Sequence, residues 1–171
     1  LKQMVKLAQF GVFTSQGIPF FFCGEEMFRT KLGEKNTYNM PDKYNAIDWS
    51  LKSKHGDLVE YYKGLIALRK AHPAFALATA EDVRKHLSFI EHENEAAVGF
   101  VLSGLEGIDS AKRIVVLMNG SREAVEFEIP NGSYKWICDG EAIAERGIGR
   151  YDVKDGKIVV APITGIVLAE F

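Results

Sequence analysis

Cysteine and long apolar runs are both scarce in this chain of 171 residues, and each shortage excludes a class of protein. The two cysteines, Cys23 and Cys138, lie far apart, and neither has a second cysteine or a histidine near it. This spacing provides neither a disulfide framework nor a zinc site, so the cellular compartment stays open. No uninterrupted apolar stretch is long enough to cross a bilayer, so we expect no membrane segment in this chain.

An excess of charge of one sign is also absent, because the formal net charge is only -2. This balance gives no electrostatic reason to expect nucleic acid or an anionic membrane as a partner. Hydrophobic residues make up 47% of the chain and charged residues 26%, which are the proportions of an ordinary globular protein. The first residues, LKQMVKLAQFGVF, lack the regions of a secretory signal, and their apolar spacing predicts an amphipathic helix entered in mid-chain.

The first part of the chain has the pattern of an α/β unit. Gly17 follows the first predicted helix, and the apolar run IPFFF at residues 18–22 predicts a strand buried on both faces, as in a parallel sheet. A long polar stretch then runs from Gly24 to Trp49. We expect it to be a loop at the C-terminal end of that strand, where α/β barrels build their binding sites.

A second helix is predicted between residues 57 and 72. Asp57 and Glu60 are spaced as in a capping box, an apolar stripe follows them, and Pro73 ends the helix. One strand with a helix on either side cannot cover its own faces or satisfy its own edges. We therefore expect residues 1–78 to be an incomplete piece of a larger domain.

Beyond about residue 79 the sequence has many short apolar runs separated by Gly, Asn and Asp. Residues 125–129 alternate strictly between apolar and charged side chains, and runs such as RIVVLMN and GIVLAEF predict further strands. The pair Asp155-Gly156 predicts a two-residue hairpin turn. Together these signals favour an antiparallel β-sandwich over residues 79–171.

Motifs in the first half resemble the end of the catalytic barrel in type I pullulanases, which are α-1,6-glucan debranching enzymes of the α-amylase superfamily. The run QGIPF is shared widely in that superfamily, whereas FRTK followed by the pattern N-x-Y-N-x-P-D-x-x-N-x-I-D-W at residues 36–49 favours pullulanase. The run YYKGLIALRKAHPAF is similar to the last barrel helix. The resemblance covers about residues 15–75. It implies an α+β chain: the last strand and helices of a (β/α)8 TIM barrel (1–78), then an antiparallel β-sandwich (79–171).

The resemblance also implies a function for the parent enzyme, namely hydrolysis of α-1,6-glucosidic linkages in pullulan, glycogen or starch with retention of configuration. The family's catalytic acids lie on barrel strands that would precede Leu1, so no catalytic residue is carried over and the chain alone is expected to be inactive. The expected partners are a branched α-glucan and the upstream part of the same barrel. No cofactor or metal ligand set is evident, although calcium is a common companion in this superfamily.

Adjacent carboxylates at Glu25 and Glu26 invite the idea of a catalytic pair. A retaining glycosidase needs two carboxyl groups about 5–5.5 Å apart, whereas neighbouring residues at a strand end point to opposite sides. We expect one of them to brace the barrel mouth, with Arg29 as a partner, and the other to be solvated.

Polar side chains after Phe28 are better candidates for sugar contact. A neutral polyhydroxyl ligand is held by many hydrogen bonds from Asn, Asp and Arg, with aromatic faces stacked on its rings, although Asn and Asp also simply favour loops. Asp42 lies where pullulanases have an Asp that contacts sugar on the non-reducing side, but Ala46 stands where some members have an Arg, so a two-residue clamp is not expected. The candidate substrate-binding residues are Arg29, Tyr38, Asn39, Asp42 and Asn45.

Two alternatives remain open, one in the same class of enzyme and one in a different class of function. An isoamylase or a glycogen-branching enzyme belongs to the same superfamily, and a stand-alone carbohydrate-binding module would use the sandwich as its working part. Trp136 is one candidate for sugar stacking there, but its place on an alternating strand with Tyr134 favours the core. The four histidines show no metal-ligand spacing and are expected at the surface or at helix ends: His55, His72, His86 and His92.

Overall fold

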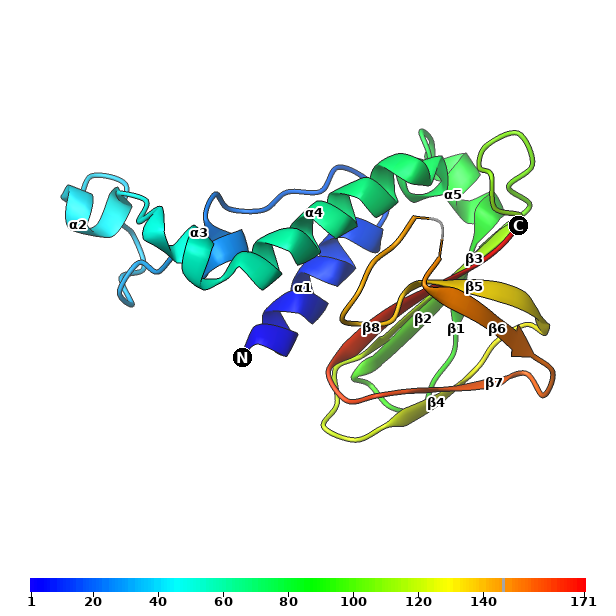
Figure 1. The fold of residues 1–171 in the computed structure, drawn as a ribbon. Helices are drawn as coiled ribbons and strands as arrows, with labels where there is room; N and C mark the ends of the chain where they lie inside the picture. Colours follow the sequence, from blue (N-terminus) through cyan, green and yellow to red (C-terminus); the bar gives the residue numbers. More distant parts are fainter. Residues whose placement is uncertain (146) are drawn as a thin grey trace.

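The computed structural model describes residues 1–145 and 147–171, and it has a helical half packed against a β-sandwich (Figure 1). The helices are α1 (Lys2–Thr14), α2 (Asp42–Asn45), α3 (Ser50–Lys54), α4 (Gly56–Ala71) and α5 (Ala80–His86), with 3-10 turns η1 (Glu25–Met27) and η2 (Pro73–Ala76). The strands are β1 (Leu87–Ile90), β2 (Ala97–Ser103), β3 (Arg113–Asn119), β4 (Val125–Glu128), β5 (Gly132–Cys138), β6 (Gly149–Val153), β7 (Lys157–Val160) and β8 (Thr164–Glu170).

The strands form two sheets in which every pairing is antiparallel. The larger sheet has the order β1-β2-β3-β8-β5-β6, and the smaller one pairs β4 with β7. The antiparallel architecture that the alternating pattern predicts is therefore confirmed.

The central strands β3 and β8 are buried on both faces. On β3, Ile114 and Val116 join a core shared with the helices, whereas Val115 and Leu117 join the core between the two sheets. Strand β8 alternates in the same way. This double burial explains why both strands read as continuous apolar runs although the sheet is antiparallel.

Helices α1 and α4 lie side by side and cover one face of the larger sheet (Figure 1). The apolar stripe predicted for α4 is confirmed, because Leu58, Tyr62 and Leu65 are buried. At Gly165 of β8, an added Cβ would lie 2.5 Å from Cδ1 of Phe10, so the aromatic ring of α1 packs where only glycine leaves room. The helices are thus fitted closely onto the sandwich.

The predicted capping box at the start of α4 is wrong. Nζ of Lys2 lies 2.6 Å from the Asp57 carboxylate, and Glu60 instead pairs with Lys63 at 2.7 Å. Asp57 therefore ties α1 to α4 rather than closing the end of its own helix. A tertiary ion pair has replaced the local contact that the spacing suggested.

The predicted hairpin at Asp155-Gly156 is also wrong. Strand β6 pairs with β5, and β7 pairs with β4, so residues 154–156 carry the chain from one sheet to the other. Gly156 has a φ of +73°, which suits glycine, and its carbonyl accepts a hydrogen bond from the Ile129 amide at 2.8 Å. The turn signal was real, but it did not determine the pairing.

The strand predicted at residues 18–22 does not form in this chain. Ile18 is 95% exposed and Phe20 is 87% exposed, and no strand is assigned there. One side of the segment nevertheless packs on the helices. The centre of the Phe21 ring lies 5.6 Å from that of Phe13 and 5.7 Å from that of Tyr62. A strand needs a neighbour to complete its hydrogen bonds, and no described segment pairs with this one.

Two histidines predicted at the surface or at helix ends lie at helix ends but are buried. His72 follows the last residue of α4, and His86 is the last residue of α5. His86 Nδ1 lies 2.8 Å from the Ser103 carbonyl, and His72 pairs with Asp109. Both side chains connect the helical half to the sandwich.

Candidate functional site

The polar loop between Gly24 and Trp49 leaves the helical half and carries α2 to the end of the molecule farthest from the sheets (Figure 1). Gly24 starts the loop in the left-handed region at φ +99°, and an added Cβ there would lie 2.7 Å from the Arg29 side chain. The turn η1 follows and buries Met27. Glycine is thus required where the loop bends back on itself.

Both acidic residues of η1 are used inside the fold. Nε2 of Gln9 donates to the Glu25 carboxylate at 2.9 Å, and the Gly24 amide donates to Glu26 at 2.9 Å. The expectation that Arg29 would be the partner of one of them and that the other would be solvated is not met. Both carboxylates instead bond to the surrounding helical half, Glu25 to the Gln9 side chain and Glu26 to the Gly24 backbone.

Arg29 and Asn45 hold the two ends of the loop together. Arg29 donates from Nη1 to the Cys23 carbonyl at 3.1 Å and from Nη2 to the Asn45 carbonyl, and its guanidinium lies over the Phe22 ring. The Asn45 amide donates to the Thr37 carbonyl at 2.7 Å and to the Met40 carbonyl at 2.8 Å. These contacts set the path of residues 29–45.

Three of the predicted sugar-contact residues project from this loop. Tyr38 is 85% exposed, and Asn39 and Asp42 are also exposed. Asp42 is the first residue of α2, so its carboxylate stands at a helix end and faces solvent. The loop therefore presents one aromatic ring, one amide and one carboxylate, braced from beneath by Arg29 and Asn45.

Lys31 is a loop residue that the sequence analysis did not select. Its Nζ donates to Oδ1 of Asn45 at 2.7 Å and lies 5.4 Å from the Phe22 ring centre. Desolvation and the charge of Arg29 both lower the pKa of Lys31. Lys31 thus helps to hold Asn45 and Phe22 in place. The only sequence signal for this contact was a second cation two positions after Arg29 in the run FRTK.

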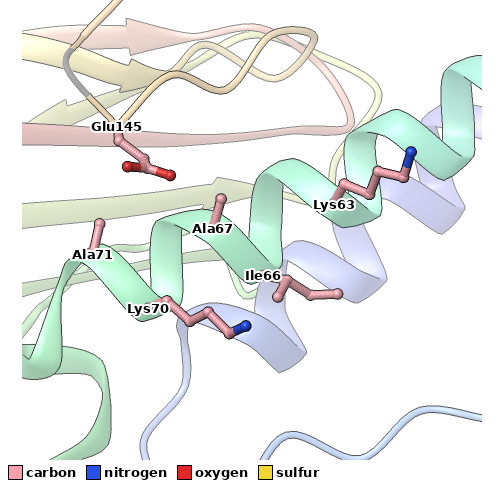
Figure 2. Close-up of a pocket in the computed structure, with 6 residues that line it drawn as sticks. All are labelled: Lys63, Ile66, Ala67, Lys70, Ala71 and Glu145. Carbon is pink, nitrogen blue, oxygen red and sulfur yellow. The ribbon is translucent and has the colours of Figure 1, made fainter.

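A separate hollow of about 410 Å³ lies between α4 and the loop after β5 (Figure 2). Lys63 and Lys70 border it on the helix, and Glu145 extends towards the helix from the loop. Ile66 and two alanines supply the rest of the lining. Among the described residues that line it, every charged one is exposed, so the hollow offers a ligand no enclosed polar group.

Within residues 1–145 and 147–171, no three His, Cys, Asp or Glu side chains are grouped so that they could hold a metal ion. No helix of the described part of the chain is long and apolar enough to span a membrane.

Comparison with known proteins decides the family. The sequence profile described as "Pullulanase, all-beta domain" matches residues 83–142. The pullulanase of Bacillus subtilis (strain 168) is 37% identical over 141 residues, which is 82% of this chain and 20% of that protein. The chain belongs to the pullulanase family. Isoamylase of a Flavobacterium species is 33% identical over 135 residues, covering 68% of this chain and 17% of its own length.

A solved structure gives the same assignment for pullulanase in three dimensions. The pullulanase type I from Bacillus subtilis str. 168, complexed with maltose, superposes with a TM-score of 0.89 at 32% identity. The superposition covers 99% of this chain and 23% of the solved chain. This chain therefore spans about a fifth of the length of the pullulanases it matches.

Proposed function

We propose that this chain works as part of a pullulanase-type debranching enzyme, which hydrolyses α-1,6-glucosidic linkages in pullulan, glycogen or starch. The observation that carries the proposal is the match to pullulanase over 99% of the chain. The solved relative holds maltose, which supports an α-glucan as the ligand of the complete enzyme. This chain would help to build the fold and to position the substrate, and it would not supply the catalytic groups.

Residues 1–78 are proposed to be the end of the catalytic (β/α)8 barrel, and residues 79–171 its C-terminal sandwich. The exposed apolar side chains of Ile18 and Phe20 support this proposal. Large apolar groups gathered at one place usually mark a contact surface. We propose that the upstream part of the same barrel covers them and supplies the strand neighbours that residues 18–22 lack.

The loop at residues 29–45 is proposed to form one wall of the glucan site. Asp42, Asn39 and Tyr38 are the proposed direct contacts, since their side chains are exposed and offer an acceptor, an amide and an aromatic face. Arg29 and Asn45 are proposed to support substrate binding chiefly by holding these three residues in place. Their own polar groups already form hydrogen bonds within the loop.

Hydrolysis by this chain alone is not expected. Glycosidic cleavage needs two carboxyl groups that face one bond, and Glu25 and Glu26 are already bonded to Gln9 and to the Gly24 amide. The test is to assay the purified chain and the complete enzyme for release of reducing sugar from pullulan. We expect release by the complete enzyme only. Release by the chain alone, made in a host that lacks amylases, would refute the proposal.

Isoamylase activity is the second candidate, and the 33% identity to the Flavobacterium isoamylase favours it. Product analysis separates the two activities. A pullulanase converts pullulan to maltotriose, whereas an isoamylase barely attacks pullulan and debranches glycogen instead. Maltotriose from pullulan would therefore support the first candidate and exclude the second.

A further inference from the structure

A groove of about 370 Å³ opens between the two sheets of the sandwich, far along the chain from the polar loop. Trp136 of β5 and Tyr151 of β6 line it from the larger sheet. Residues of β4 and β7 line it from the smaller sheet, and Asp155 closes the corner where the chain crosses between them. Its volume lies within the range of about 300–1,000 Å³ that small-molecule pockets usually have.

The wall on the larger sheet is aromatic and only partly covered. The rings of Trp136 and Tyr151 lie 5.2 Å apart at an angle of 58°, and both side chains are half-buried. Gly149 is the register partner of Trp136 on the edge strand β6. Directly opposed residues of an antiparallel pair point to the same face, and an added Cβ at Gly149 would meet no atom of the described residues within 4 Å. Open space therefore lies beside the indole.

The opposite rim is charged, and its balance is negative. Nζ of Lys157 lies 2.6 Å from the Glu126 carboxylate, so that pair is already neutralised. Asp155 adds a further exposed carboxylate. Nucleotides, nucleic acids and acidic peptides are therefore disfavoured, because they would bring like charge to the groove. A neutral ligand rich in hydroxyl groups has no such cost, and its hydroxyls can donate to the carboxylates.

We propose that this groove is a second binding site for a short linear α-glucan chain, separate from the loop at residues 29–45. The weakly positive C–H face of a glucosyl ring would lie against the negative faces of Trp136 and Tyr151. Its hydroxyls would meet Glu126, Lys157 and Asp155 at the rim. The identity of the sugar rests on the proposed function. The combination of an aromatic wall and a charged rim rests on the contacts described for Trp136, Tyr151 and Lys157.

The experiment uses the fact that the chain has only two tryptophans, Trp49 and Trp136. The variant Trp49→Phe leaves Trp136 as the only tryptophan, and its emission is followed while maltoheptaose is added to a concentration on the order of 10 mM, which detects a millimolar Kd. Gly149→Leu in the same background fills the open space beside the indole. Arg150→Leu is the matched control, since it places the same side chain on the same strand but on the opposite face.

We expect a saturable change in Trp136 emission, a Kd raised about tenfold by Gly149→Leu, and an unchanged Kd in Arg150→Leu. Tyr151→Ser provides a second way to weaken the site if Gly149→Leu does not fold, which circular dichroism would show. An emission that does not change, or equal Kd values in the Gly149→Leu and Arg150→Leu variants, would overturn the proposal.

Failure of this site and failure of the proposed function give different results. The variant Trp136→Phe leaves Trp49, which follows the polar loop, as the reporter. If maltoheptaose changes the emission of Trp49 but not that of Trp136, the groove proposal is wrong and the loop proposal gains support. A complete enzyme that hydrolyses neither pullulan nor glycogen refutes the proposed function independently of either emission signal.

Discussion

Nδ1 of His72 lies 2.9 Å from Oδ1 of Asp109, and both side chains are buried. The same carboxylate accepts hydrogen bonds from the Ala111 amide at 2.9 Å and from the Ala74 amide at 3.2 Å. His72 follows α4, whereas Asp109 belongs to the segment that enters β3. One buried carboxylate therefore fastens the end of the helical half to the sandwich.

Removal of this carboxylate should destabilise the chain strongly. Asp109→Ala leaves the His72 ring and two backbone amides without their acceptor, and such losses cost about 3–5 kcal/mol of the free energy of unfolding. Urea unfolding followed by circular dichroism measures the change. Glu106→Ala is the control, because Glu106 is an exposed acid in the same segment. Equal stability of the two variants would show that the buried pair contributes nothing.

The contribution of Asp109 should disappear in acid. Burial alone would raise the pKa of this carboxyl, but the hydrogen bonds from His72, Ala111 and Ala74 outweigh burial and lower it. A lowered folded-state pKa gives stability that is complete above the unfolded value of about 3.9 and is lost as the pH falls through the folded pKa.

The difference in urea midpoint between the natural chain and Asp109→Asn should therefore narrow as the pH falls below about 4. A difference that stays constant down to pH 2.5 would contradict this assignment.

Arg69 is expected to stabilise the end of α1. Its guanidinium donates to the carbonyls of Phe13 at 2.8 Å, Ser15 at 2.7 Å, and Gly17, which have no further helical turn to bond. Arg69→Met should lower the free energy of unfolding by about 1–3 kcal/mol, because hydrogen bonds from a charged donor are the stronger kind. Lys70→Met, at the exposed neighbouring position, should change it little; similar losses in both would argue against the capping role.

The two thiols should differ sharply in reactivity. Cys23 is exposed, whereas Cys138 is fully buried and burial raises the pKa of its thiol to about 11. At about pH 8, roughly one Cys138 thiol in a thousand is ionised, and only the thiolate reacts. Ellman's reagent should therefore modify one thiol per chain quickly and the second only in urea. Rapid modification of the Cys23→Ser variant would show that Cys138 is accessible.

Asp42 provides the sharpest test of the loop. In the complete enzyme, Asp42→Ala should raise KM for pullulan about tenfold, because the substrate hydroxyls lose the charged carboxylate that accepts their hydrogen bonds. Thermal stability should stay unchanged, because the carboxylate is exposed. Lys43→Ala, at the next exposed position of α2, should leave KM unaltered. The loop proposal loses its basis if the two variants behave alike.

The sandwich could be predicted from the sequence because its signals are local. Val125, Phe127 and Ile129 alternate with charged residues and point into the core between the sheets. Helix α5 was missed for the converse reason: its sequence AEDVRKH carries no apolar stripe, and only the Thr79 hydroxyl, which accepts from the Asp82 amide, marks its start.

Contacts between segments far apart in the chain could not be predicted from local sequence patterns. The spacing of Asp57 and Glu60 fits a capping box, but the folded chain brings Lys2 close enough to form an ion pair with Asp57. At Asp155-Gly156 the sequence specifies a change of direction, yet the neighbours of β6 and β7 decide where each strand pairs.

The same limit applies to the candidate site. The composition of the loop indicated sugar contact, but it did not distinguish Asn45, whose amide bonds to the loop backbone, from Asn39, which is exposed. That distinction depends on which carbonyls the folded loop brings near each amide.

The position of β8 has a consequence for synthesis. Thr164–Glu170 is the last strand along the chain, yet it lies between β3 and β5 in the middle of the larger sheet. During translation, the strands on either side have no central partner until Glu170 has left the ribosome. Closure of the sheet is then a late, long-range event, and such events are slow. A chain cut short before Thr164 would therefore hold two half-sheets, β1-β2-β3 and β5-β6, that cannot join.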